Sequence, residues 1–229
     1  MRYDLNMFSS DLTPKAAQTR ARIRDAAIAS FIERGYPDTT LRLIATEAGV
    51  SVGNAYYYFP SKTHLVQELY EQVQHDHAEV ATPLLDSATS LVDRLRIVLE
   101  TGLTNLERYR NVAPGFLSAM IAPDSPINPL SRESSPARDL TLELLRKAVS
   151  GAQHRLPDDI ADRLPDAVFV AYLGLVLRWT YDDSDGQART QRLLDTALKL
   201  LAVALPFTRM PGVHGVARDL LDQVAEVRA

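Results

Sequence analysis

The strongest constraint on the fold of this chain is the spacing of its apolar residues, which recur at helical intervals along nearly its whole length. No stretch alternates apolar and polar residues for long enough to make a convincing β-strand. The 229 residues are 46% hydrophobic and 24% charged, so the chain can bury a substantial core. We therefore predict an all-α protein, preceded by a loose arm at residues 1–12.

Capping residues and helix breakers divide the sequence into segments. Pro14 suits the first turn of a helix, and Gly35 suits the end of one. Asp185 is expected to cap the helix that follows it, and Pro165 to break or kink the helix around it. The predicted helices cover about residues 14–34, 41–48, 51–59, 62–80, 88–109, 114–121, 137–152, 158–181, 186–205 and 214–227.

The helical pattern also indicates two domains. Past Thr82-Pro83 it changes to longer helices, interrupted by a loop rich in proline and serine at residues 122–136. The chain is long enough for a small domain fused to a larger one. We place the first domain at residues 14–61 and the second at residues 62–229.

Several kinds of chemistry are excluded by residues that the sequence lacks. It has no cysteine, which excludes disulfides, thiolate catalysis and cysteine-ligated metals. No apolar run reaches the ~18–20 residues of a membrane span, and residues 1–10 do not resemble a secretory signal. We therefore expect a protein of the cytoplasm that has no membrane partner.

His75 and His77 invite a metal-site interpretation. Side chains two positions apart on a helix diverge by about 200°, so these imidazoles cannot easily bind one metal. We treat both as solvated and expect neither a metal nor a cofactor. The sequence also lacks carboxylates paired at reactive spacing and a glycine-rich phosphate loop. An enzyme with its active site in the helical body is thus the less favoured alternative.

The charge distribution separates the start of the chain from the remainder. Residues 15–62 carry seven basic and four acidic side chains, whereas residues 63–229 have a net charge of −6. A basic segment on an acidic body is expected when only that segment meets phosphate, although scatter over a mixed-charge surface would look similar.

Residues 41–59 carry the pattern that is most informative about function. A helix at 41–48, a turn at Gly49 and a second helix at 51–59 predict a helix-turn-helix, whose second helix enters the major groove of DNA. Its small core is predicted to comprise Ile44, Ala45, Ala48, Val50, Ala55 and Phe59.

The outward side chains of this unit suit DNA. Tyrosine hydroxyls and the Lys62 ammonium can meet phosphate oxygens, Gly53 permits close approach, and Asn54 can read a base, ideally adenine. The alternative, that the three consecutive tyrosines only pack, requires all three to face inward on one helix. The predicted DNA-binding residues are Thr40, Arg42, Ser51, Val52, Gly53, Asn54, Tyr56, Tyr57, Tyr58 and Lys62.

The sequence Gly-Val-Ser-Val-Gly-Asn-Ala-Tyr-Tyr-Tyr-Phe-Pro-Ser-Lys at 49–62 resembles the DNA-binding domain of TetR-family regulators, within a wider match at 22–69. Ala55 and Tyr58 depart from the residues most common in that family. The resemblance implies three DNA-binding helices and a larger helical bundle that binds a ligand and dimerises through its last two long helices.

The apolar pattern of residues 190–205 extends nearly all round the helix, which predicts burial on two sides. We expect a homodimer formed through the helices near 163–181 and 186–205, the alternative being core burial within a monomer. The candidate effector-binding residues, each of which taken singly is better explained as a core residue, are Asn105, Tyr109, Phe116, Met120, Tyr172, Arg178 and Trp179.

Arg178 is the only basic residue within 165–181, so an acidic effector head would be directed toward it unless it pairs with Asp182. Together these features predict a repressor that binds a palindromic operator as a homodimer and is released by a mainly apolar small molecule. An activator and a ligand-independent DNA binder are the remaining alternatives.

Overall fold

The structure, a computed structural model, describes residues 13–121 and 125–226. The expected arm at 1–12 and part of the expected 122–136 loop lie outside the described residues. Within the described ranges the chain is helical and contains no strand, as predicted. It divides into two compact units, one ending at Leu69 and the other beginning at Tyr70, so the division falls inside a helix.

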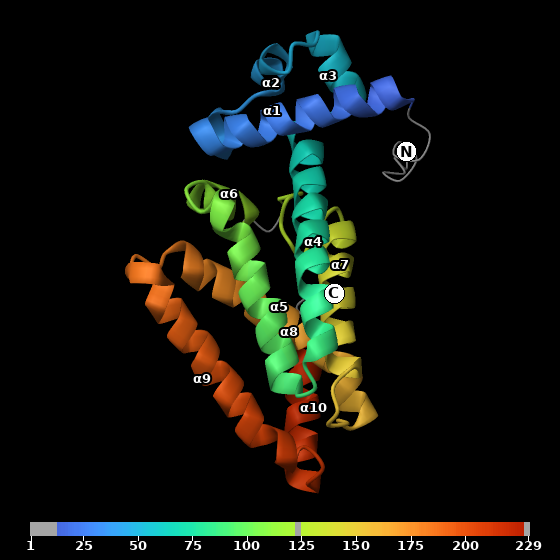
Figure 1. Ribbon diagram of the computed structural model, residues 1–229, viewed down its shortest axis with the longest axis vertical. Coiled ribbons are helices and arrows are strands. Elements are labelled where there is room, and N and C mark those ends of the chain that lie inside the picture. The colour runs from blue at the N-terminus through green and yellow to red at the C-terminus, as the bar shows by residue number, and fades with distance from the viewer. Residues whose placement is uncertain (1–12, 122–124, 227–229) are drawn as a thin grey trace. The chain divides into compact units, whose positions relative to one another are not determined.

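The first unit contains α1 (Pro14–Asp38), α2 (Leu41–Glu47), α3 (Val52–Tyr58) and the beginning of α4 (Lys62–Ser87). Thr13 caps α1, and Gly35 interrupts its helical conformation with a φ of 81°, which is where the sequence predicted the helix to end. Helices α2 and α3 pack against each other, and α2 packs on α1 (Figure 1).

The core of the first unit is built from both small and large apolar side chains. The predicted helix-turn-helix core is confirmed at five positions and is only half-buried at Val50. The buried apolar residues of this unit are Ile23, Ala27, Phe31, Leu41, Ile44, Ala45, Ala48, Ala55, Phe59, Leu65, Val66 and Leu69.

The second unit is a helical bundle around one continuous apolar core. Helix α8 lies at its centre and packs against both α7 and α10, while α9 contacts α5 and α8 (Figure 1). Its helices are the remainder of α4, α5 (Leu91–Leu106), α6 (Ala113–Met120), α7 (Ser135–Ser150), α8 (Asp158–Thr180), α9 (Ala188–Ala204) and α10 (Pro211–Glu226). None of the described helices is long and apolar enough to cross a membrane.

Two prolines lie inside helices that continue past them. Helix α4 was expected to end near residue 80 but runs through Pro83 to Ser87, and α8 runs unbroken through Pro165. A proline removes one hydrogen bond from the helix. Ala81 and Leu85, fully buried on either side of Pro83, offset that loss by packing into the core.

The start of α9 is capped by a residue from outside the helix. Asp185, the predicted cap, makes no such bond; instead the buried Asp182 carboxylate accepts hydrogen bonds from the backbone N–H and hydroxyl of Thr190, both at 2.7 Å. Ser184 donates to it as well, at 2.5 Å from its hydroxyl. Burial opposes ionisation of this carboxyl, but these hydrogen bonds outweigh it and hold its pKa well below the usual range.

Arg94 joins three helices by donating only to backbone carbonyls. Its buried guanidinium reaches the oxygens of Leu85 and Ala88 at the end of α4, at 2.5 and 2.8 Å. It also reaches those of Lys147 and Ala148 at the end of α7, at 2.9 and 2.8 Å. These carbonyls carry the partial negative charge of helix C-termini, which a cation stabilises. Arg94 therefore fixes the start of α5 against the ends of α4 and α7.

Replacing Arg94 with methionine should lower the free energy of unfolding by about 3 kcal/mol, because several buried carbonyls lose charged donors. Urea denaturation followed by circular dichroism measures this change. The matched control is Arg96→Met on the same helix, where the half-exposed guanidinium pairs with Glu100 and Asp195. In that control the free energy of unfolding should fall by about 1 kcal/mol or less. Equal decreases in the two variants would contradict the role given to Arg94.

Candidate functional site

The second helix of the helix-turn-helix is fixed at both ends by the residues around it. Gly49 adopts a φ of 65°, a conformation that glycine tolerates, and makes the turn between α2 and α3. The Ser51 hydroxyl then caps α3 by accepting from the Asn54 N–H at 3.1 Å. Ala55 is fully buried against α2 and allows the close crossing of the two helices. The opposite face of α3 is left open.

The open face of α3 presents aromatic hydroxyls and one amide. Tyr56 and Tyr57 are 50% and 71% exposed, so the prediction that the three tyrosines cannot all face inward is confirmed. Tyr58 is half-buried, and its ring meets that of Tyr57 edge to face. The Asn54 side-chain amide has no hydrogen-bond partner among the described residues. This face therefore offers donors to phosphate and one group that can read a base edge.

The other predicted DNA-binding residues differ in exposure. Arg42, Ser51 and Gly53 are exposed and Val52 is half-buried. Thr40 is exposed as well, but its hydroxyl caps α2 by accepting from the Leu43 N–H at 3.2 Å. The hydroxyls of Thr40 and Ser51 thus already serve within the protein, where they fix the starts of α2 and α3. The DNA-binding role of these residues stays a prediction.

Lys62 is placed differently from what its expected role requires. Its ammonium donates to the carbonyl oxygens of Tyr36 and Thr39, at 2.6 and 2.9 Å, and lies 4.1 Å from the centre of the Tyr36 ring. Burial lowers the pKa of this ammonium. Lys62 therefore connects the start of α4 to the α1–α2 turn, a role that the sequence did not indicate. Its expected phosphate contact stays a prediction.

Several arginines of the basic segment are engaged in ion pairs within the first unit. Arg20 of α1 pairs with Glu68 of α4 at 2.7 Å and lies over the Phe59 ring. Arg34 contacts both Glu33 and Glu47 at 2.8 Å. Arg42, by contrast, forms no ion pair with the residues that the structure describes. The positive charge available to DNA is thus smaller than the residue count alone indicates.

The candidate effector-binding residues all belong to the second unit, where they fall into two groups. Phe116, Tyr172 and Trp179 are buried. The half-buried group comprises Asn105, Tyr109, Met120 and Arg178. Asn105 donates to the Val73 carbonyl at 2.7 Å, so its amide already serves to join α5 to α4.

Arg110, rather than Arg178, is the basic residue that contacts Trp179. Its guanidinium lies 5.1 Å from the indole centre and donates to the carbonyl oxygens of Trp179 and Asp182. The alternative of an Arg178–Asp182 ion pair is not seen, because the Asp182 carboxylate accepts from Ser184 and Thr190. This contact could not be predicted from the sequence, because Arg110 and Trp179 are far apart along the chain.

The prediction that both histidines of α4 are solvated is wrong for His77. Its side chain is only 2% exposed, and Nε2 donates to the Val98 carbonyl of α5 at 2.9 Å. Burial lowers the pKa of this imidazole. His75 is exposed. Position 77 lies four residues after the buried Val73 and four before the buried Ala81, a helical spacing that could have identified it as buried. No cluster of potential metal ligands occurs within the described ranges.

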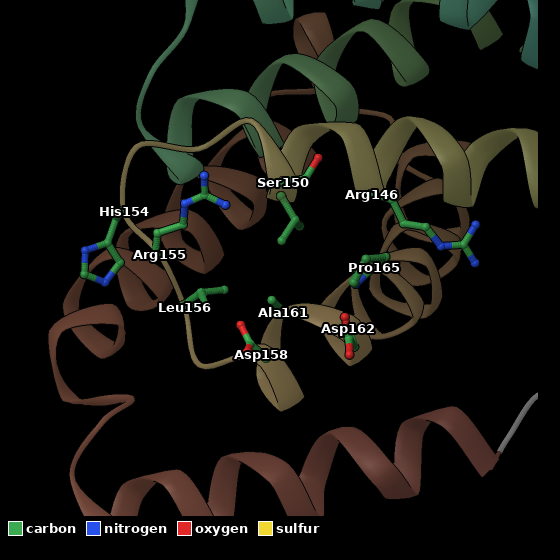
Figure 2. A pocket seen from close by; sticks show the side chains of 10 residues that line it. Arg146, Ser150, His154, Arg155, Leu156, Asp158, Ala161, Asp162 and Pro165 are labelled. Carbon is green, nitrogen blue, oxygen red and sulfur yellow. The ribbon is translucent and has the colours of Figure 1, made fainter.

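An open pocket of about 310 Å³ lies between the end of α7 and the start of α8 (Figure 2). Its apolar lining residues are Val149, Leu156, Ala161 and Pro165. Its polar lining residues are the arginines Arg146 and Arg155, the aspartates Asp158 and Asp162, and Ser150 and His154. None of the candidate effector-binding residues lines this pocket, which is at the small end of the range for ligand sites.

A helix-turn-helix with an open aromatic face, followed by an all-α bundle, defines the architecture of a DNA-binding transcriptional regulator. A family model for bacterial regulatory proteins of the tetR family matches residues 23–69. A second model, for the tetracyclin repressor-like C-terminal domain, matches residues 94–225, more than half of the chain. The protein therefore belongs to the TetR family, whose members are transcriptional regulators rather than enzymes.

Individual relatives agree with this assignment. The chain is 29% identical over 201 residues to the HTH-type transcriptional regulator TtgR of Pseudomonas putida, covering 83% of this chain and 94% of TtgR. A tetR-family regulator from Streptomyces coelicolor has the same fold, with a TM-score of 0.61, 15% identity and coverage of 90% and 89%. The regulator FadR from Bacillus subtilis, solved with stearoyl-CoA, superposes with a TM-score of 0.60, 18% identity and coverage of 76% and 95%.

Replacing Lys62 with methionine should destabilise the DNA-free protein by about 1–2 kcal/mol, because two backbone carbonyls lose a charged donor. Chemical denaturation in the absence of DNA measures this effect. Arg42→Met, at an exposed position without an ion pair among the described residues, is the control and should leave stability within about 0.5 kcal/mol. A Lys62 variant as stable as the wild type would leave phosphate contact as the remaining role of this side chain.

Proposed function

We propose that this protein is a repressor that binds a palindromic operator as a homodimer and leaves it when a mainly apolar small molecule binds the helical bundle. The observation that carries the proposal is the open face of α3, with Tyr56, Tyr57 and Asn54 presented beside the two helix caps. In a helix-turn-helix this face is the one that enters the major groove, where phosphate contacts set the position and base contacts set the sequence.

DNA selection from a random pool with the full-length protein tests this function, and it should yield sites with two-fold symmetry. On such a site, Asn54→Ala should cost about 1–3 kcal/mol of binding free energy and leave binding to random DNA nearly unchanged. Fluorescence anisotropy at fixed salt measures both affinities. Equal losses on selected and random DNA would assign Asn54 a positioning role, and failure to select any site would reject the function.

The proposed homodimer rests on the second apolar face of α9. Leu194 and Leu198 pack into the core, whereas Leu200 and Val203, on the other side of the helix, are 70% and 66% exposed. Leu193 extends the exposed stripe toward the start of the helix. A helix that is apolar on both sides is expected when its outer side is covered by another chain. Dimerisation would also place two recognition helices roughly 34–36 Å apart, one turn of DNA.

Helix α10 carries a further exposed apolar stripe that the sequence analysis did not assign to the interface. Val213, Val216 and Leu220 are exposed, whereas Ala217 and Leu221 pack against the core. The spacing of the exposed residues, three and four positions apart, puts them on one side of the helix. We include this stripe with that of α9 in the proposed dimer surface.

Replacing both Leu200 and Val203 with glutamate should weaken dimerisation by roughly 100-fold or more, because buried charges without partners are costly. Light scattering across the micromolar range should give about twice the 25.4 kDa chain mass for the wild type and a monomer for the variant. Val80→Glu, at an exposed apolar residue of α4 in the same unit, is the control and should stay dimeric. A monomeric wild type would contradict the proposed operator geometry.

An apolar effector is supported by the side chains available in the second unit. The buried candidates Phe116, Tyr172 and Trp179 offer aromatic surface with few polar groups. FadR proteins from Bacillus subtilis and Thermus thermophilus were solved with stearoyl-CoA and lauroyl-CoA, ligands with long apolar chains. Helix α4 contributes residues to both units, so a ligand that favours one position of α4 could shift the DNA-binding equilibrium by its differential affinity.

A further inference from the structure

The loop between α7 and α8, residues 151–157, is tied to other parts of the bundle. The Gln153 N–H donates to the Thr89 carbonyl of the α4–α5 turn at 2.8 Å. The Arg155 carbonyl accepts from the Arg209 guanidinium, just before α10, at 2.9 Å. Leu156 is buried. These contacts fix the loop on one side of the open pocket of about 310 Å³, so the pocket is a pre-formed feature of the second unit.

The charges that line this pocket are divided between its two sides. Arg146 lies on α7 and Arg155 in the loop, whereas Asp158 and Asp162 lie one turn apart at the start of α8. Figure 2 shows both arginines on the side of α7 and the loop, and both aspartates on the side of α8. With His154 neutral, the lining carries no net charge. The pocket therefore has a positive side and a negative side of equal formal charge.

These four charged side chains form no ion pair with any residue in the described ranges, 13–121 and 125–226. Elsewhere on the same helix such pairing does occur, since Arg163 pairs with Asp222 of α10. Two carboxylates four residues apart on a helix repel each other, so Asp158 and Asp162 are unfavourable neighbours unless a cation lies close to them. The charges on the two sides of the pocket are thus available to a ligand.

A backbone acceptor adds to the negative side of the pocket. Pro165 has no N–H, so the carbonyl of Ala161, four residues earlier, lacks its usual intrahelical donor. Both residues line the pocket, and together with Asp158 and Asp162 they have the spacing of one helical face. One face of α8 therefore presents two carboxylates and a carbonyl, all of which accept hydrogen bonds, beside apolar surface.

We propose that this pocket binds a small zwitterion with an apolar side chain, such as an apolar α-amino acid. The ammonium group lies at the aspartates of α8, the carboxylate lies toward Arg155, and the apolar side chain packs against Leu156 and Pro165. A ligand with a single charge would compensate one side of the pocket and leave the other without a partner. The pocket is small, which suits a ligand of this size.

This site is separate from the proposed effector site, because none of the candidate effector-binding residues lines the pocket. It also differs in ligand class, since the effector is expected to be mainly apolar. The inference therefore goes beyond the proposed function and does not depend on DNA binding.

Three probes that share a phenyl ring and a short chain test the proposal: L-phenylalanine, 2-phenylethylamine, which lacks the carboxylate, and 3-phenylpropanoate, which lacks the ammonium group. Binding to the full-length protein is measured by calorimetry at pH 7. We expect L-phenylalanine to bind at least about fivefold more tightly than either single-charge probe.

Two variants assign the charges to the two sides of the pocket. Asp162→Asn should weaken binding of L-phenylalanine and 2-phenylethylamine by about threefold or more and leave that of 3-phenylpropanoate unchanged. Arg155→Gln should weaken binding of L-phenylalanine and 3-phenylpropanoate and leave that of 2-phenylethylamine unchanged. Both side chains are exposed, so the melting temperature without ligand should stay that of the wild type.

The matched controls are Asp139→Asn and Arg132→Gln, at exposed positions of the second unit that do not line the pocket, and both should keep wild-type affinity for all three probes. The proposal is overturned if a single-charge probe binds as tightly as L-phenylalanine, if none of the three binds, or if Asp162→Asn and Arg155→Gln behave like the controls. Failure of DNA selection rejects the regulatory function instead, so the two failures are distinguishable.

Discussion

The helical bundle depends on a cation buried where two helices end. Helix C-termini leave carbonyl groups without intrahelical partners, and burying them without donors would cost more than packing returns. Arg94 supplies donors to the ends of both α4 and α7 from a single side chain. Gly151 leaves the space that the guanidinium occupies, since a Cβ there would lie 2.2 Å from one of its nitrogens. The position of the end of α4 within the helical bundle follows from this arrangement.

The parts of the structure that could be predicted from the sequence are those fixed by neighbouring residues. Gly49 and Ser51 determine the turn and the start of α3 through a positive φ and a local cap, and both are evident in the sequence. The small Ala45 and Ala55 indicate where α2 and α3 cross, because only small side chains permit that approach. Consequently the helix-turn-helix was predicted almost to the residue, and the exposed face of α3 with it.

The parts that could not be predicted depend on residues far apart in sequence. Lys62 reaches carbonyls more than twenty residues earlier, and Arg110 contacts the end of α8 and the turn after it, about seventy residues later. Capping of α9 by Asp182 instead of Asp185 depends on a loop conformation that composition does not determine. The prediction that His77 is solvated was wrong although the signal is local, because its helical spacing from Val73 and Ala81 marks it as buried.

Several arginines of the second unit donate to backbone oxygens, alongside others that pair with carboxylates. Besides Arg94 and Arg110, Arg138 donates to the carbonyls of Pro129 and Ser131, and Arg209 donates to that of Arg155. A carbonyl does not titrate, and a hydrogen bond to it depends little on counterions, whereas each contact with a DNA phosphate releases them. A change in ionic strength would therefore weaken contacts with DNA phosphate while leaving these hydrogen bonds to carbonyl oxygens largely unchanged.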